Sequence, residues 1–118
     1  MPKRFPTIQG GYYHIYNRGA GRLAIFLEER NYLYLLRLLK RVAAECDVTV
    51  VAYNLLPNHY HWLLRQGGET PVGRVPARVV GGYSQAFNRA HHRTGTLFEG
   101  PYKALEVDTD AYFVNVCC

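Results

Sequence analysis

Apolar side chains along the chain change from a helical spacing to a strand spacing and back. Over residues 29–46 they recur every three to four positions, with most of the basic residues between them, which predicts an amphipathic helix. Residues 11–18, 48–56 and 59–65 are instead rich in β-branched and aromatic side chains, as strands are. The stretch 48–56 is apolar enough throughout to predict a central strand of a sheet.

The second half of the chain continues the alternation. Residues 76–93 carry apolar side chains at helical spacing, and Pro76 suits the first turn, where no N–H is needed. Residues 97–107 are expected to form a fourth strand with an irregular start at Pro101, since proline cannot donate to an interior ladder. A Thr-Asp pair predicts the cap of a last helix from Ala111.

The order of these elements is β-α-β-β-α-β, followed by the start of a helix. It predicts an α+β fold of the ferredoxin-like kind, with one antiparallel sheet and two helices on one face. The chain has 118 residues, 48% of them hydrophobic, which is enough for one core and too few for two. We therefore expect a single domain over residues 1–118.

The composition adds a basic, aromatic character. Fourteen Lys and Arg against nine Asp and Glu give a net charge of +5, and 14% of the residues are aromatic. Cations neutralise phosphates and flat rings stack on bases, so this suits nucleic acid, with a solvated basic surface as the alternative. The three cysteines form no disulfide framework or zinc motif, and no apolar run could span a bilayer, so we expect a cytoplasmic protein without membrane contact.

The sharpest chemical feature is a pair of histidines separated by one residue. On a strand His59 and His61 would point to the same face, with Cβ atoms about 6.5–7 Å apart, close enough to bind one divalent metal. Tyr60 would point to the packed face. For a bare His-x-His pair, two satisfied histidines on an ordinary strand are the simpler interpretation.

The surroundings of this pair resemble a known family. Residues 52–64, Ala-Tyr-Asn-Leu-Leu-Pro-Asn-His-Tyr-His-Trp-Leu-Leu, are similar to the signature strand pair of the HUH single-tyrosine transposases, and in particular of the REP-associated tyrosine transposase branch. Residues 13–19 resemble that family's first strand and 25–27 the approach to its first helix. Residues 87–89 and 94–100 resemble its second helix and fourth strand.

This resemblance implies a metal-dependent DNA nickase and strand transferase. In that family the paired histidines, here His59 and His61, hold a Mg²⁺ or Mn²⁺ ion that polarises the scissile phosphate of single-stranded DNA, usually beside a hairpin. A tyrosine on the last helix attacks, which gives a 5′-phosphotyrosyl intermediate and a free 3′-OH. Relatives pair their sheets edge to edge, so the resemblance also implies a homodimer.

The chain departs from the family pattern at the nucleophile. Residues 110–112 resemble the segment that introduces the nucleophile helix, and the family's tyrosine follows about two helical turns later, just beyond Cys118. A chain truncated there would be inactive. Tyr112 is the nearest substitute, with packing of the last helix as its alternative role. One turn further on stands Val116, with Asn115 beside it, whereas the family has Asn or Gln as a third metal ligand.

Four basic residues flank the family-like motifs and are candidate contacts to DNA phosphates: Arg18, Arg89, Arg93 and Lys103. Pro101 stands where the family carries Arg, so one contact is expected to be missing. For His14 we expect a structural hydrogen bond. Besides the transposase, two alternatives remain open: a non-catalytic domain that binds hairpins without cutting, and a metal-binding module unrelated to DNA, whose DNA binding would be absent or insensitive to salt.

Overall fold

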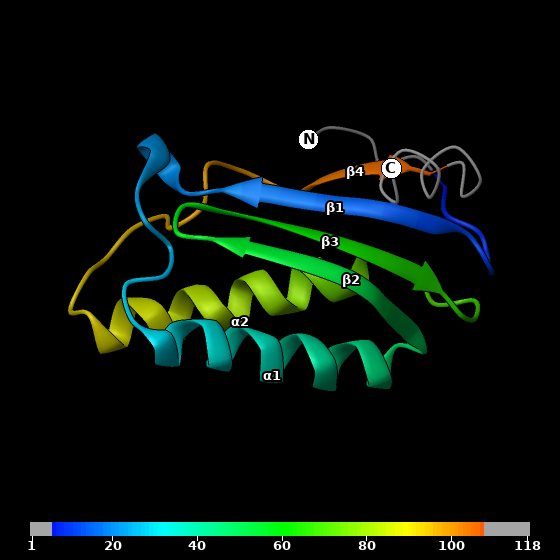
Figure 1. Cartoon of the computed structure of the whole chain (residues 1–118), viewed down its shortest axis with the longest axis horizontal. Helices are drawn as coiled ribbons and strands as arrows, with labels where there is room; N and C mark the ends of the chain where they lie inside the picture. The colour runs from blue at the N-terminus through cyan, green and yellow to red at the C-terminus, as the bar shows by residue number, and fades with distance from the viewer. Residues whose placement is uncertain (1–5, 108–118) are drawn as a thin grey trace.

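The computed structural model describes residues 6–107, which form one four-stranded sheet and two long helices. The elements are β1 (Tyr12–Arg18), a short 3₁₀ turn η1 (Ala20–Arg22), α1 (Glu29–Glu45), β2 (Val48–Leu56), β3 (His59–Gln66), α2 (Arg74–Ala90) and β4 (Lys103–Glu106). The strands are antiparallel in the order β2-β3-β1-β4, and both helices lie on one face of the sheet (Figure 1). The predicted α+β, ferredoxin-like fold is confirmed.

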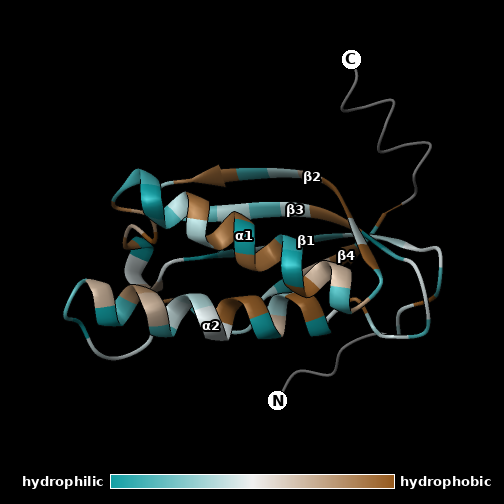
Figure 2. Ribbon diagram, turned by 90° about the horizontal axis from the view of Figure 1, so that it is seen from below, coloured by the Kyte–Doolittle hydropathy of each residue, from teal (hydrophilic) through white to brown (hydrophobic). Residues whose placement is uncertain are grey.

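The core lies between the sheet and the helices. Inward side chains of the two central strands are fully buried, among them Ile15, Tyr60 and Trp62 at 0% exposure. Each such aliphatic or aromatic side chain contributes about 1.5–3 kcal/mol when it leaves water. Figure 2, viewed from the helix side, shows α1 and α2 side by side with hydrophobic and hydrophilic segments alternating along each. Within residues 6–107 there is no helix long and apolar enough to cross a membrane.

Helix α1 has nearly the predicted bounds, whereas α2 is shifted towards the N-terminus. We predicted 76–93, but α2 spans Arg74–Ala90. It begins earlier because Val75 and Pro76 are both buried against the core, and Pro76 still lies in the first turn. It ends earlier because the chain turns at His92, which has a φ of 50°.

The strand predicted over 48–56 has the predicted bounds, but its central position in the sheet is wrong, and so is the length of the strand predicted over 97–107. The apolar stretch Val48–Leu56 is β2, an edge strand that pairs only with β3 within the described residues, and Tyr53 in it is 54% exposed. The expected strand over 97–107 shrinks to Lys103–Glu106. Leu97 and Phe98 are buried, and Phe98 makes an isolated bridge to Gly19. The chain then bends before it joins the sheet beside β1.

The alternation along β3 sets up the opposite face of the sheet. Tyr60, Trp62 and Leu64 are buried towards the helices, so His59 and His61 lie on the face that the helices leave uncovered. The register with β1 places Arg18 opposite His59 and Tyr16 opposite His61. The segment before α1 holds the turn that precedes His59. The backbone N–H groups of Ile25 and Phe26 donate to the Pro57 carbonyl at 2.7 and 3.2 Å.

Candidate functional site

Three histidines meet on the helix-free face of the sheet. His59 and His61 lie next but one on β3, with ring centroids 5.1 Å apart and ring planes at 90°. His14 on β1 adds a third ring, and its Nε2 lies 2.9 Å from Nδ1 of His61. Tyr16 stacks beside His61 with centroids 5.8 Å apart and planes at 22°. The structure therefore places the two predicted histidines on one face and joins to them a histidine from the neighbouring strand.

In each histidine of the pair, the ring nitrogen Nδ1 makes a hydrogen bond to a neighbouring side chain. Asn58 accepts a hydrogen bond from Nδ1–H of His59 on its side-chain oxygen, at 2.7 Å. For His61 the partner of Nδ1 is the His14 ring. The Nε2 atoms of both have no hydrogen-bond partner among residues 6–107. The expected structural hydrogen bond of His14 is thus observed, and its partner is His61.

The electrostatics of the cluster favour neutral rings. Burial lowers the pKa of His61, and the neighbouring His14 and His59 lower that pKa further. Burial also lowers the pKa of His14. Neutral imidazole is the form that binds metals, since only a ring nitrogen without a proton has a lone pair to give.

A cleft of about 640 Å³ opens beside the histidines, at the end of the sheet where β1 stops and β3 starts. His59 and His61 line it together with three cations, one carboxylate and the loop before β4. The lining residues are Tyr16, Asn17, Arg18, Arg22, Asn58, His59, His61, Glu99, Gly100, Pro101 and Lys103. The excess of cations gives the cleft a positive charge that suits an anionic ligand.

One of these cations is already paired. Arg18 binds Glu99 through two nitrogens, with Nε donating to one carboxylate oxygen and Nη2 to the other at 3.0 Å. The hydrogen bonds and charge of this pair raise the pKa of Arg18, and the hydrogen bond from Arg18 is the main cause that lowers the pKa of Glu99. Both side chains remain about half exposed, at 50% and 46%. Glu99 thus occupies the planar donor fork of Arg18, a geometry that binds carboxylates and phosphates alike.

The structure brings together part of the predicted site. Arg18 and Lys103 line the cleft with the two histidines. Arg89 is exposed in the last turn of α2, away from the cleft lining. Arg93 donates to the side-chain oxygen of Asn88 at 2.7 Å and so holds the turn after α2. The DNA contacts of Arg89 and Arg93 stay predictions.

Several cleft residues were missed by sequence reasoning. Asn58 directly precedes His59 and was visible only as part of a turn. Arg22 follows the glycine-rich break after β1. Glu99 belongs to the family-like stretch 94–100, but nothing in the sequence indicated a function for it. Tyr112, the candidate nucleophile, lies outside the described residues, as does the helix predicted from Ala111.

The imidazole nitrogens of His59 and His61 suit a divalent cation and would supply two of its ligands. Within residues 6–107 no group of three or more His, Cys, Asp or Glu side chains is arranged to hold a metal. His59 and His61 nevertheless share one face of the sheet and line the cleft, and Nε2 of each has no hydrogen-bond partner among residues 6–107. Orienting hydrogen bonds on the other ring nitrogen, as here, are typical of histidines that bind metals. The remaining ligands would come from water, from a phosphate or from residues outside 6–107.

Comparisons with known proteins identify a family and a shared fold. The model of the family described as "Transposase IS200 like" matches residues 7–116. A presumed transposase from Deinococcus radiodurans, solved as a crystal structure, is 20% identical with a TM-score of 0.67, over 99% of this chain and 95% of that one. A REP-associated tyrosine transposase bound to a REP hairpin is 18% identical with a TM-score of 0.70, over 98% of this chain and 68% of that one. No curated protein matches the sequence. At these identities the two structures show a shared fold.

Proposed function

Because the chain belongs to the family of IS200-like transposases, we propose that it nicks single-stranded DNA beside a hairpin and transfers the cut strand. The observation that carries this proposal is the pair His59 and His61 at a cleft that also holds Arg18, Arg22 and Lys103. A hairpin-bearing DNA as the partner is supported by the structural neighbour solved with a REP hairpin.

The proposed cofactor is Mg²⁺ or Mn²⁺, held by Nε2 of His59 and Nε2 of His61. When bound, such a cation supplies positive charge to the non-bridging oxygens of a phosphodiester. Imidazole nitrogen is a softer ligand than the oxygens that Mg²⁺ prefers, so these two histidines should bind Mn²⁺ more tightly than Mg²⁺. The lowered pKa of His61 favours its neutral ring, which metal binding requires.

The proposed reaction passes through a tyrosine. The phenolic oxygen forms a bond to the phosphorus while the bond from phosphorus to the 3′-oxygen breaks. The phenol loses its proton to solvent, the 3′-oxygen takes one up, and the 5′ side of the break stays joined to the protein as a phosphotyrosine. The reverse step on another 3′-OH completes strand transfer. Within this chain Tyr112 is the candidate for that role.

The cations of the cleft have a separate task, to hold the DNA backbone. Arg22 and Lys103 line the same wall as the histidines, and Arg18 joins them when it leaves Glu99 for a phosphate. A homodimer, as in relatives of the HUH family, and a cytoplasmic location complete the proposal.

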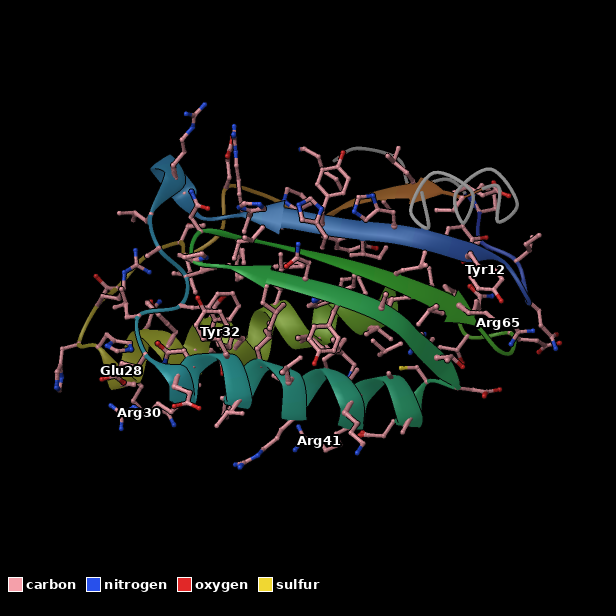
Figure 3. The ribbon with its side chains drawn as sticks, viewed as in Figure 1. Tyr12, Glu28, Arg30, Tyr32, Arg41 and Arg65 are labelled. Carbon is pink, nitrogen blue, oxygen red and sulfur yellow. The ribbon has the colours of Figure 1, made fainter. Side chains whose placement is uncertain are left out.

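The experiment that tests this function mixes the protein with labelled single-stranded hairpin oligonucleotides and Mn²⁺, followed by a denaturing gel and intact mass. A covalent adduct that needs the metal and disappears in His59→Ala supports the proposal, and peptide mapping then identifies the tyrosine. Arg41→Ala, on the helix side of the molecule (Figure 3), is the matched control and should form the adduct normally. Salt-sensitive binding without an adduct would favour a hairpin-binding domain without catalysis. Absent or salt-insensitive binding would reject a DNA function.

A further inference from the structure

The two histidines of the pair are oriented by different kinds of partner. His59 is bound by the residue directly before it, Asn58, at 2.7 Å. His61 is bound at 2.9 Å by His14, which is 47 positions away in the sequence and lies on the neighbouring strand. Both contacts use Nδ1 of the ring on β3, so both leave Nε2 without a hydrogen-bond partner among residues 6–107, in two residues that line the cleft.

The chemistry of the imidazole ring makes these contacts decisive. A neutral imidazole carries one N–H, and the nitrogen that bears it has no lone pair for a metal. The side-chain oxygen of Asn58 only accepts, so Nδ1 of His59 must carry the proton and Nε2 must carry the lone pair. Asn58 therefore fixes the tautomer of His59 in the form that can bind a metal through Nε2.

The contact between His14 and His61 allows two arrangements. Either Nδ1–H of His61 donates to Nε2 of His14, or Nε2–H of His14 donates to Nδ1 of His61. In the first, Nε2 of His61 is free to bind a metal, and in the second it carries a proton and cannot. Metal binding at His61 thus requires that His14 accepts and keeps its own proton on Nδ1.

The sheet holds His14 where this contact is possible. β1 is paired on both sides, so His14 lies opposite Leu63 of β3 and Leu105 of β4. Its ring stacks beside His61, with centroids 5.1 Å apart and planes at 27°. The Tyr16 ring lies 5.0 Å from His14 and 5.8 Å from His61, so three rings support one another.

We propose that Asn58 and His14 are positioning residues that set the tautomers of His59 and His61, so that both Nε2 atoms present lone pairs to the cleft. This rests on the proposed function, because it assigns the metal of that site to these two nitrogens. If the tautomers of the two histidines were not fixed, both Nε2 atoms would carry a lone pair at the same time in only part of the molecules. The metal affinity would fall accordingly. Removing an orienting partner of this kind lowers metal affinity by about 10–100-fold.

The first test reads the tautomers without any metal. Long-range ¹H–¹⁵N spectra of the protein labelled at histidine, in EDTA, show which ring nitrogen carries the proton. We expect Nδ1–H at both His59 and His61 in the wild type. In His14→Phe, which keeps an aromatic ring but has no acceptor, we expect His61 to populate Nε2–H. In Asn58→Ala we expect the same change at His59 alone. A wild type with Nε2–H at His61, or no change in either variant, would overturn the proposal.

The second test measures Mn²⁺ binding by the electron paramagnetic resonance signal of the free ion. His14→Phe should bind about 10–100-fold more weakly than the wild type, and His14→Gln, whose amide oxygen can accept, should recover most of the affinity. Backbone amide spectra identify any variant that fails to fold, and Asn58→Asp then serves as a second conservative variant that keeps an acceptor.

If His14→Phe binds Mn²⁺ as the wild type does, the positioning role is wrong and the proposed function stands. If the tautomers respond but the wild type binds no Mn²⁺, the metal site of the proposed function is wrong while the positioning role stands.

Discussion

Glu99 provides a direct way to perturb the proposed DNA cleft. Its carboxylate accepts hydrogen bonds from both Nε and Nη2 of Arg18. A phosphate can therefore bind these two donors only after the Glu99 carboxylate has separated from them. The cleft lining holds three cations and this one carboxylate, so its formal charge rises from +2 to +3 in Glu99→Gln. The variant therefore frees one cation for a phosphate and removes one repulsive charge.

The expected magnitude follows from counterion release. Each phosphate contact to a single strand contributes about 0.7 to the slope of log affinity against log salt. With Arg18 released, Glu99→Gln should bind hairpin-bearing single-stranded DNA more tightly at low salt. The slope should steepen by about 0.7, so affinity falls about 2.6-fold more than in the wild type for each fourfold rise in salt.

The assay is fluorescence anisotropy with labelled DNA in EDTA over a series of salt concentrations. Glu45→Gln is the matched control, because Glu45 pairs with Arg78 at 3.2 Å outside the cleft and the substitution changes net charge by the same amount. The reasoning is refuted if the slope of Glu99→Gln equals that of the wild type. It is equally refuted if Glu45→Gln steepens the slope as much, since net charge alone would then explain the effect.

Three further predictions follow from single contacts. In the Glu99→Gln background, adding Arg18→Ala should remove the extra salt slope of about 0.7, whereas adding Arg41→Ala, on the helix side, should leave the slope unchanged in the same anisotropy assay. Because burial lowers the pKa of His61 below 6.5, the unfolded chain takes up a proton that the folded chain resists, so the stability of the metal-free protein should fall as the pH drops through 6.5. Urea unfolding at about pH 5 and about pH 7.5 measures this difference, which should shrink in His61→Asn. Tyr83→Phe should lower the free energy of unfolding by about 1–2 kcal/mol in urea titrations, because the buried Tyr83 hydroxyl donates to the Ile25 carbonyl and the variant leaves that carbonyl without its donor.

Much of the fold could be predicted because its signals are local. The helical spacing of apolar residues gave α1 to within one residue, and the alternation along His59–Gln66 placed both histidines on one face. The position of β2 could not be predicted in this way. An apolar run shows that a strand is buried somewhere, and the packing of α1 against β2 buries part of it even at the edge of the sheet.

The missing parts of the site depend on long-range pairing. Nothing near His14 in the sequence indicates that it contacts His61, because that contact depends on the register between β1 and β3. The pair of Arg18 and Glu99 joins residues 81 positions apart and needs the bridge that brings the loop before β4 beside the end of β1. Local patterns therefore found the two proposed metal ligands and missed the residues that orient them.

The central claim is that His59 and His61 hold the metal, and the chain's own histidines allow a direct measurement. Mn²⁺ broadens nuclear magnetic resonance signals close to it, so substoichiometric Mn²⁺ is added to protein with ¹³C-labelled histidine. The ring signals of His59 and His61 should broaden first and that of His14 next, while His91 and His92, which follow α2 and do not line the cleft, should stay sharp. Broadening of His91 or His92 at the same or lower Mn²⁺ concentration than the pair would contradict the account.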